Sequence, residues 1–458
     1  MLKLGQELVC KIEEITILGR GVCKADGLVI FVDGAVYGDR CKIRVTDVKK
    51  SYATAVCTEM IEKSERRVES ECPYFPFCGG CVHRCISYSD ECQIKENAVR
   101  RALLKVSLSD ENVKPLIATK DEGYRNKAVF HFDGGNVGFY AAGSNKLVPF
   151  SDALCGIYPP SFHKIATDSA EYFSDKKTAA DSLTLRVSTD GKICAVIDSK
   201  MNDKNARAYA EYIKGRHGEI SGVLSVRGKN RELSLEIGDK HIMSTLAGLK
   251  FRISPEAFFQ VNYDGAEKIA EIVLNFAEKC SFTKCADLYC GTGTLGIILA
   301  SRFKNASFTG VEINKSAVKD AKYNAELNGL KNIEFFCGDA AKYAAENKPE
   351  LSVVDPPRRG MSGEAVKVLT DMHPDNIIYV SCNPSTLARD AARLADHGYK
   401  ISEAVPINMF PRSEHVECVM LLTCEKGRAK LYGEYFMNRS VADIMKEYGE
   451  QHDEWGTL

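Results

Sequence analysis

The stretch ADLYCGTGTLGIILA, residues 286–300, decides the fold of this chain. Its first residues predict a buried strand, its glycines a tight turn, and the apolar residues after the turn the start of a helix. Gly291, Gly293 and Gly296 have the spacing G-x-G-x-x-G of dinucleotide-binding folds. Expected strands alternate with expected helices from about residue 255 to residue 425, which predicts a doubly wound α/β sheet.

Two acidic residues end the strands that follow. Glu312 closes the segment FTGVE about 20 positions after Gly291, where such folds place a ribose-binding carboxylate. Nicotinamide enzymes and class I methyltransferases share this feature. The next strand, LSVVDPPRRG, ends in Asp355 and two prolines. Hydride transfer has no need of such a loop, which resembles the catalytic loop of methyltransferases that act on nucleobases or amides.

A cysteine stands at the end of a further expected strand. In YVSCNPSTLARD, residues 379–390, the apolar run ends near Cys382, and Pro384 prevents the strand from continuing. Ligands bind at the carboxyl ends of strands in open α/β sheets, so Cys382 lies where a nucleophile would lie. A single free cysteine is more often a small buried apolar residue, so this interpretation depends on the rest of the chain.

Residues 1–60 contain short β-rich runs separated by glycines, which predicts a small closed barrel that binds oligonucleotides or a structural β cap. The segment GRGVCKADGLVIFVDGAVYGDR, residues 19–40, resembles a TRAM domain, an RNA-binding barrel of RNA-modifying enzymes. Phosphate contacts are expected from Lys42, Arg44, Lys49 and Lys50, although acidic residues lie between them.

The segment CPYFPFCGGCVHRC, residues 72–85, has three cysteines with the spacing C-x5-C-x2-C. A structural zinc usually takes its other ligands close by, often as a second C-x2-C pair, and no such pair follows. Three clustered cysteines plus a distant one is an iron–sulfur pattern, and zinc remains the alternative. We expect His83 to be an ordinary surface residue. Candidates for the fourth ligand are Cys85, Cys92 and Cys155.

Residues 95–250 begin with the helix-like segment KENAVRRALLKV and continue with alternating runs. They predict an α+β region with hairpins at Asp133-Gly134-Gly135 and Asp190-Gly191. Its basic residues fit either contacts to a phosphate backbone or a solvated helix face. These are Arg100, Arg101, Lys105, Arg125 and Lys127.

Length and composition limit the number of domains and the kinds of partner that the chain can have. The chain has 458 residues, enough for roughly three domains, and a formal net charge of -1. A nucleic-acid partner must therefore be argued from motifs and local patches. No membrane span or signal peptide is evident, so we expect a soluble, cytoplasmic protein. In a reducing compartment its 18 cysteines indicate metal binding, nucleophilic chemistry or burial rather than disulfides.

Five motifs, in order FFQVN, DLYCGTG, DPPRRG, YVSCNPSTLARD and SEHVECVMLL, resemble the signature set of the RNA uracil-5-methyltransferases, up to about residue 422. The early cysteines, the YRNK segment at residues 124–127 and Cys155 resemble its iron–sulfur branch. The resemblance implies an α/β multidomain fold: an OB-like TRAM β-barrel (1–60), a central α+β region with the cluster (61–250), a class I Rossmann-like methyltransferase domain (251–425) and an unassigned tail (426–458).

The resemblance also implies the roles of individual residues. Cys382 would be the catalytic nucleophile and Glu417 the general base. Contacts to S-adenosylmethionine would come from Gln260, Tyr289, Thr294, Glu312, Asp339 and Asp355. Ligands of a 4Fe–4S cluster, structural or RNA-positioning, would be Cys72, Cys78, Cys81 and Cys155.

The chemistry explains why such a site needs a thiolate and a carboxylate. Attack of a thiolate on C6 of uracil makes C5 nucleophilic, and after methyl transfer a base must remove the C5 proton. The thiol pKa would need lowering by nearby cations or dipoles, for which Arg358, Arg359 and Arg389 are candidates. Strand alternation places His415 on the same face as Glu417. The base must leave its stack, so unpaired RNA is the expected substrate.

The predicted function is therefore methylation of C5 of a uridine in RNA, with 23S ribosomal RNA favoured and transfer RNA as the alternative. A remote alternative is a nicotinamide or iron–sulfur oxidoreductase, which would leave Cys382 without a role. A third is a non-catalytic RNA-binding protein, which would tolerate substitution of Cys382 and Glu417. No membrane and no obligate protein partner are expected.

Overall fold

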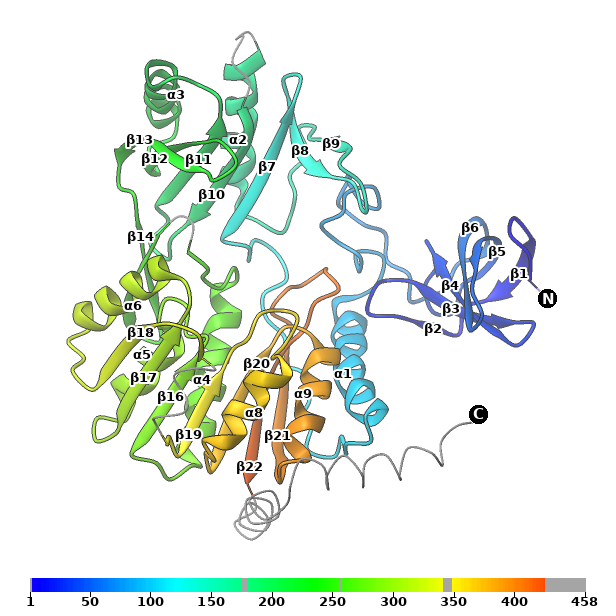
Figure 1. Cartoon of the computed structure of the whole chain (residues 1–458). Helices are drawn as coiled ribbons and strands as arrows, with labels where there is room; N and C mark the ends of the chain where they lie inside the picture. The colour runs from blue at the N-terminus through cyan, green and yellow to red at the C-terminus, as the bar shows by residue number, and fades with distance from the viewer. Residues whose placement is uncertain (1, 175–179, 255–256, 341–347, 425–458) are drawn as a thin grey trace.

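The computed structural model describes residues 2–174, 180–254, 257–340 and 348–424. It consists of a small strand-rich unit at the N-terminus, an α+β region, and a larger sheet covered by helices (Figure 1). The predicted tail after residue 425 lies outside the described residues.

The N-terminal unit is a six-stranded sheet that wraps around its own core. Alternate residues such as Ile30, Val32, Ile43 and Val45 point inward and are buried, as the period of a strand requires. The strand order is β1-β5-β6-β4-β3-β2. The strands are β1 (Glu7–Lys11), β2 (Glu14–Ile15), β3 (Gly21–Ala25), β4 (Leu28–Asp33), β5 (Arg40–Val48) and β6 (Tyr52–Glu62).

The central region contains a seven-stranded sheet in the order β13-β12-β11-β10-β7-β8-β9, with two helices packed on one face. Both predicted hairpins are present: residues 134–135 join β7 to β8, and residues 188–192 join β10 to β11. The elements are β7 (Lys127–Asp133), β8 (Asn136–Tyr140), β9 (Leu147–Pro149), α2 (Pro160–Ser174), β10 (Ala180–Val187), β11 (Ile193–Ser199), α3 (Asp203–Arg216), β12 (Ile220–Arg227) and β13 (Glu232–Gly238).

After the hairpin β14 (Ile242–Leu246) and β15 (Leu249–Ile253), the chain forms the predicted doubly wound sheet, in the order β18-β17-β16-β19-β20-β22-β21. Strands β18 to β20 are parallel, and β22 is antiparallel to both its neighbours. Its strands are β16 (Lys284–Leu288), β17 (Ser307–Glu312), β18 (Ile333–Cys337), β19 (Leu351–Val354), β20 (Asn376–Ser381), β21 (Tyr399–Ile407) and β22 (Glu417–Cys424).

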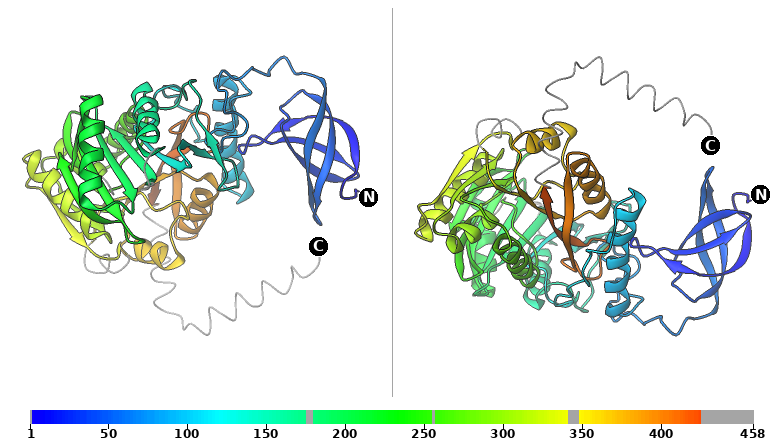
Figure 2. Two further views of the ribbon diagram at one scale, coloured as in Figure 1. Left: turned by 90° about the horizontal axis from the view of Figure 1, so that it is seen from above. Right: turned by 90° about the horizontal axis from the view of Figure 1, so that it is seen from below.

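Helices cover both faces of this sheet (Figure 2). One layer holds α4 (Tyr263–Glu278), α5 (Thr294–Arg302) and α6 (Lys315–Leu327). The other holds α8 (Gly363–Asp371), α9 (Pro384–Ala395) and, from much earlier in the chain, α1 (Tyr88–Lys105). Because the central strands β19, β20 and β22 are buried on both faces, they are apolar without alternation.

A buried ionic network joins α1 to the loop between β21 and β22. The ammonium of Lys95 is fully buried and donates to Glu91 Oε1 and to Asn408 Oδ1, both at 2.7 Å. It also donates to the Phe410 carbonyl at 2.9 Å. The Arg412 carbonyl accepts from the backbone N–H of Val82 at 2.7 Å. The loop that leads to Glu417 is therefore held by residues more than 300 positions earlier.

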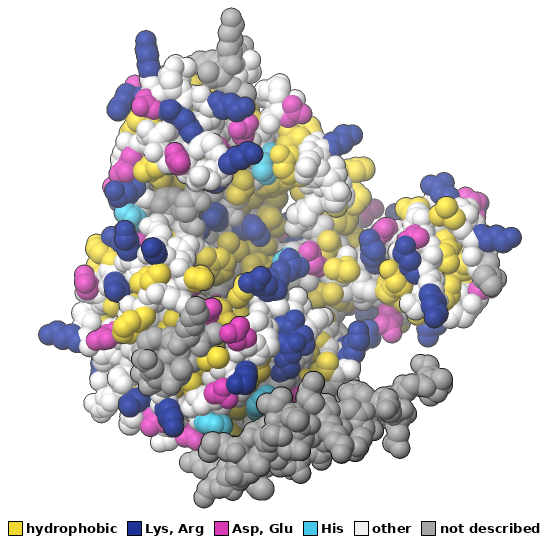
Figure 3. All heavy atoms as spheres, viewed as in Figure 1, with side chains coloured by type: hydrophobic (Ala, Val, Ile, Leu, Met, Phe, Trp, Pro, Cys, Tyr) yellow, Lys and Arg dark blue, Asp and Glu magenta, His cyan; other side chains and the backbone are white. Residues whose placement is uncertain are grey.

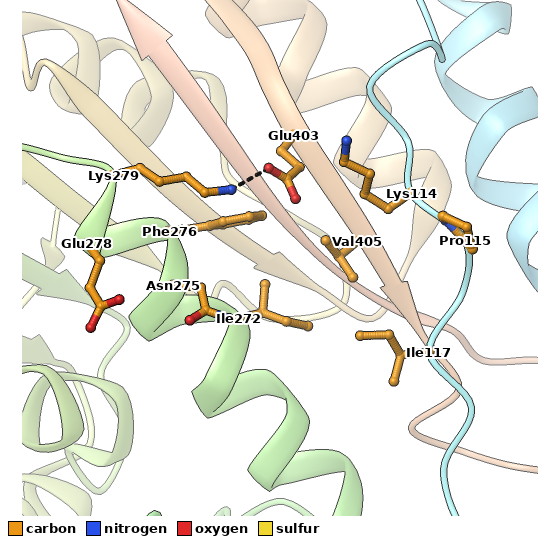
Figure 4. A pocket seen from close by; sticks show the side chains of 10 residues that line it. All are labelled: Lys114, Pro115, Ile117, Ile272, Asn275, Phe276, Glu278, Lys279, Glu403 and Val405. Atoms are coloured by element: carbon orange, nitrogen blue, oxygen red, sulfur yellow. Dashed lines mark hydrogen bonds and ion pairs between the residues drawn. The ribbon is translucent and has the colours of Figure 1, made fainter.

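A shallow pocket lies at the edge of the same sheet, between the end of α4, β21 and residues 114–117 (Figure 4). The ion pair between Lys279 and Glu403, 2.5 Å long, spans it. None of the predicted site residues lines this pocket.

Candidate active site

Three predicted site residues meet at the carboxyl edge of the doubly wound sheet. Ser381, the last residue of β20, pairs with Cys418 in β22, so the next step of this antiparallel register places Cys382 opposite Glu417. Asp355 follows Val354, the last residue of the neighbouring strand β19. Pro384 stands at the beginning of α9, which confirms the prediction that the strand ends before it.

The two carboxylates of this group are electrostatically linked. Glu417 is only 3% exposed, and burial together with the nearby Asp355 carboxylate raises its pKa well above the ordinary value. Burial likewise raises the pKa of Asp355. Two buried carboxylates that repel each other favour a state in which they share one proton.

The thiol of Cys382 is half-buried beside them. Burial raises its pKa to about 11, and the carboxylates of Glu417 and Asp355 add to the rise. Of the three candidate cations, Arg358 lowers this pKa but does not offset the rise. Arg389 instead forms an ion pair with Asp390 at 2.8 Å.

The backbone of Arg358, the arginine beside the thiol, is held by Asn383 and Thr386 at the start of α9. Its carbonyl accepts from Asn383 Nδ2 at 3.4 Å and from Thr386 Oγ1 at 3.3 Å. Its guanidinium lies 3.3 Å from His415 Nδ1. Strand β22 begins only at Glu417, so the alternation used to place His415 beside Glu417 does not apply. His415 contacts Arg358 and Glu414 instead.

A pocket opens beside this group, and four of the six predicted cofactor contacts line it: Gln260, Tyr289, Thr294 and Asp355. It is also lined by Leu246, Phe258, Phe259, Ala266, Ile269, Asp287, Cys290, Gly291, Thr292 and Leu295. Glu312 adjoins the pocket, because its Oε2 accepts from the Gly291 N–H at 3.1 Å. Burial raises the pKa of the Tyr289 hydroxyl, and the nearby exposed Asp339 adds to the rise.

The turn before α5 shapes the pocket. Tyr289 has a left-handed backbone, φ 62°, which is strained for a residue with a large side chain. Gly293 has φ 80°, and a Cβ there would lie 2.6 Å from the Phe335 ring. The sequence therefore needs glycine at this position so that the turn can approach β18.

Asp287 is a pocket residue that the sequence analysis missed. Its side chain is 1% exposed and accepts from the Gly296 N–H at 2.8 Å. Burial raises its pKa to about 7, and the carboxylates of Asp355 and Glu312 add to the rise. The available signal was a charged residue in an otherwise apolar strand, ADLYC.

Comparisons with known proteins agree with this geometry. Residues 2–58 match the TRAM domain, residues 248–375 the methyltransferase small domain, and residues 341–425 the tRNA (uracil-5-)-methyltransferase family. An uncharacterized RNA methyltransferase from Caldanaerobacter subterraneus is 35% identical over 91% of this chain and 99% of its own length. Another, from Halalkalibacterium halodurans, is 33% identical over 90% and 95% of the two chains.

The chain belongs to the RNA (uracil-5-)-methyltransferase family. The crystal structure of Pyrococcus abyssi tRNA (uracil-54, C5)-methyltransferase in complex with S-adenosyl-L-homocysteine has the same fold. Its TM-score is 0.74 at 24% identity, over 91% of this chain and 100% of that one. The protein is thus an S-adenosylmethionine-dependent RNA methyltransferase with an N-terminal TRAM domain, as the sequence predicted.

The four predicted cluster ligands of this methyltransferase all contact the core of the central region. Cys72 and Cys155 belong to that core, and Cys78 and Cys81 pack against it. The thiols interact electrostatically, and burial raises the pKa of Cys78, Cys81 and Cys155. Within the described ranges, however, no three His, Cys, Asp or Glu side chains converge closely enough to hold a metal ion.

Unpaired polar atoms surround these thiols. Arg84 lies against Cys81, and its Nη1 donates to Glu122 Oε1 at 3.1 Å, but its Nε and Nη2 are buried without an acceptor. The hydroxyl of Tyr158, next to Cys155, is buried without a partner as well. Buried donors without acceptors are costly, so this pattern fits an acceptor-rich, anionic group between the thiols.

The other cysteine candidates have their contacts elsewhere. Cys85 lies beside Arg67, and Cys92 accepts from Asn408 Nδ2 at 3.7 Å. The prediction that His83 is a surface residue is wrong: it is 0% exposed, and its Nε2 lies 2.9 Å from the Ile17 carbonyl. Burial lowers its pKa to about 4. Sequence could not show that the TRAM unit covers this position.

Two of the four basic residues expected to contact phosphate are paired with acids. Lys42 lies 2.6 Å from Glu7, and Lys49 lies 2.9 Å from Asp47. These ion pairs are solvent-exposed and therefore weak, so they do not prevent contact with RNA. In the part of the chain that the structure describes, no helix has both the length and the apolar character needed to cross a membrane.

Proposed function

We propose that this methyltransferase modifies C5 of a uridine in RNA through a covalent bond between Cys382 and C6 of the base, with Glu417 as general base. The observation that carries the proposal is the register of β20 and β22, which brings Cys382 opposite the buried Glu417, close to Asp355, a residue that lines the pocket. The register thus brings nucleophile and base side by side at one edge of the sheet, so that both could act on the same base.

The pocket supports the predicted cofactor contacts. Gln260, Tyr289, Thr294 and Asp355 line it directly, and Glu312 and Asp339 adjoin it. When bound, S-adenosylmethionine supplies an electrophilic methyl group on a positively charged sulfonium. A positive charge near Asp355 counters one of the two carboxylates that, in addition to burial, raise the pKa of the Cys382 thiol. Cofactor binding would therefore activate the nucleophile, with Arg358 already beside it.

The raised pKa of Glu417 favours its proposed role, which is to remove the C5 proton. A buried carboxylate with a raised pKa is a stronger base than one in water, and removal of the C5 proton needs such a base. Elimination of the Cys382 thiolate then restores the aromatic ring. Exclusion of water around Glu417 keeps the proton transfer specific to the substrate.

For the substrate, we propose 23S ribosomal RNA, on the resemblance of the TRAM unit and cysteine-rich segment to enzymes that modify it. Transfer RNA is the second candidate, because the structurally similar Pyrococcus abyssi enzyme acts on tRNA uracil-54. Both offer the unpaired uridines that a base-flipping enzyme requires. A cytoplasmic location accords with either substrate and stays a prediction.

Tritium release from C5-tritiated uridine RNA tests this function. Ribosomal and transfer RNA fractions are supplied separately, with and without S-adenosylmethionine, and Cys382→Ala serves as the control. We expect cofactor-dependent release that is absent in the variant, and the better fraction identifies the substrate class. Absence of release from either RNA, with cofactor bound, would refute C5 methylation.

We further propose that Cys72, Cys78, Cys81 and Cys155 hold a 4Fe–4S cluster. The support is chemical: Cys72 and Cys155 belong to the central core, Cys78 and Cys81 pack against it, and the Gly80 N–H donates to Cys78 Sγ at 3.4 Å. The unpaired donors of Arg84 would face the anionic cluster. Its role would be structural or RNA-positioning, and no step of methylation passes through it. Iron and zinc analysis of the purified protein decides between cluster and zinc.

A further inference from the structure

One end of the central sheet has an uncovered face. Helices α2 and α3 pack on the opposite face. On the near face, Ile242 of β14 covers the part formed by β11 and β12, where it packs with Val196 and Leu224. At the β7–β8 end of this near face, Val129 and Tyr140 are each 39% exposed.

Strand alternation sorts the side chains of β7 and β8 between the two faces. Phe130 and Phe139 point into the helix-covered core, so Val129, His131 and Tyr140 point to the other side. The rings of His131 and Tyr140 are parallel within 19°, with centroids 4.0 Å apart. Together they form a flat stack that is partly open to solvent.

A third ring comes from the cysteine-rich segment. Cys78 forms an isolated bridge with Ala141, and the Gly79 N–H donates to the Tyr140 carbonyl at 3.0 Å, so this segment lies against the end of β8. Phe77 lies in the turn just before Cys78. Phe77 is 70% exposed. We call Phe77, Val129, His131 and Tyr140 the open aromatic face.

This face begins close to the active site. The Asn126 N–H donates to the Val261 carbonyl at 2.7 Å, and Asn126 Nδ2 donates to the Gln260 carbonyl at 3.0 Å. Gln260 lines the cofactor pocket. Strand β7 leads away from it, so His131 lies roughly 15 Å from this junction at about 3.3 Å per residue. Figure 3 shows hydrophobic side chains gathered in the hollow between the central region and the large sheet, with Lys and Arg nearby.

Exposed aromatic rings beside basic residues are the common platform for unpaired nucleotides. Each base has a flat face that stacks on a ring without regard to sequence, and Arg or Lys contacts the backbone. Here Arg125 and Lys127 stand where β7 begins. The chain as a whole carries a net charge of -1, so its RNA affinity must come from such local surfaces rather than from bulk charge.

We propose that the open aromatic face stacks unpaired RNA bases that flank the target uridine. The proposal rests on the RNA substrate of the proposed function and adds where its neighbouring bases lie. Tyr140 and His131 form the platform, and Phe77 stacks on the next base along the strand. A flipped uridine at Cys382 leaves its neighbours unstacked, and this face would replace the stacking they lose.

Binding of two 12-nucleotide probes tests the proposal without cofactor: fluorescein-labelled oligo(rA), and an abasic ribose-phosphate strand of the same length. Fluorescence anisotropy gives Kd at low salt. We expect Tyr140→Ala and His131→Ala to weaken oligo(rA) binding about tenfold and to leave abasic binding unchanged, because stacking needs a base. Tyr140→Phe keeps the ring and should bind as wild type does.

Tyr323→Ala is the matched control, since Tyr323 is also 39% exposed but lies on α6 of the large sheet. It should not change the affinity for either probe. The proposal is overturned if wild-type protein binds both probes equally, if Tyr140→Ala binds oligo(rA) as wild type does, or if that variant loses affinity for both probes alike.

Kinetics separates this proposal from the function on which it rests. In tritium release, Tyr140→Ala should raise KM for RNA about tenfold and keep kcat at saturating RNA. A lower kcat with unchanged KM would place Tyr140 in the chemistry and refute a stacking role. If wild-type protein releases no tritium, the proposed function fails, while the two-probe comparison still decides the stacking platform.

Discussion

Cys382 and Cys81 are both partly buried, but the side chains around them differ. Cys382 stands at a strand end beside the carboxylates of Glu417 and Asp355, with Arg358 as the opposing cation. Cys81 stands in an aromatic core beside Arg84, close to the thiols of Cys78 and Cys72. Burial raises the pKa of both Cys382 and Cys81.

The two sites differ in the sign of the charge that would complete them. At Cys382 there is an excess of acid, so the site is completed by a positive ligand such as a sulfonium. Around Cys81 there are buried donors of Arg84 without acceptors, so that site is completed by a negative group. In the proposed function the same residue type would form a transient covalent bond in one place and ligate a cluster in the other, and four variants test this contrast.

Cys382→Ala should have the largest effect on catalysis. Without the nucleophile C5 is not activated, and we expect tritium release to fall by ~10⁴-fold or more. Because Cys382 lies at the sheet edge, the thermal unfolding midpoint and the iron content should stay at wild-type values. Residual release within a factor of ten of wild type would contradict a covalent mechanism.

Glu417→Gln should slow turnover by ~10²–10⁴-fold and trap the intermediate. Methyl transfer can occur, but the C5 proton remains, so a covalent RNA adduct accumulates. The measurement is a denaturing gel of protein with labelled RNA and S-adenosylmethionine. Glu414→Gln is the matched control, since Glu414 contacts His415 rather than the thiol. A gel without a slow-migrating band for Glu417→Gln would count against Glu417 as the base.

Cys81→Ser should affect the proposed cluster site and not the methylation site. We expect loss of the brown colour and of iron, and a destabilisation of roughly 2–4 kcal/mol, because the buried Arg84 donors lose their anionic partner. Visible absorption, iron analysis and thermal unfolding measure this. Cys85→Ser and Cys92→Ser are controls that should keep iron. Iron retained at the wild-type level in Cys81→Ser would remove this residue from the ligand set.

Arg358→Met should have the smallest effect, on thiol reactivity. The Arg358 guanidinium lowers the pKa of the Cys382 thiol. Without it that pKa is higher, so less thiolate exists at pH 8. One pKa unit corresponds to about tenfold slower alkylation, which is recovered as pH rises toward the new pKa. Iodoacetamide labelling of the peptide that contains Cys382, followed by mass spectrometry, measures the rate. Arg359→Met should label at the wild-type rate.

Sequence predicted the parts of the site that depend on strand ends. The alternation of strands and helices placed Asp355 and Cys382 at one edge, and the motif around Glu417 completed the group. It could not give the pKa of Cys382, because that value depends on carboxylates from two other strands. It misplaced His83, because the contact that helps to bury this ring comes from Ile17, 66 positions earlier. It missed Asp287, although a charged residue in an apolar run was a usable signal.

The link between Lys95 and Asn408 has a consequence for the timing of assembly. These residues are 313 positions apart, and the loop they fix leads directly to Glu417. At about 5–20 residues per second of synthesis, Lys95 precedes Asn408 by roughly 15–60 s. Residues 72–81 and helix α1 are thus synthesised well before Glu417, the proposed base. A nascent chain that has not yet reached residue 417 is therefore expected not to methylate RNA.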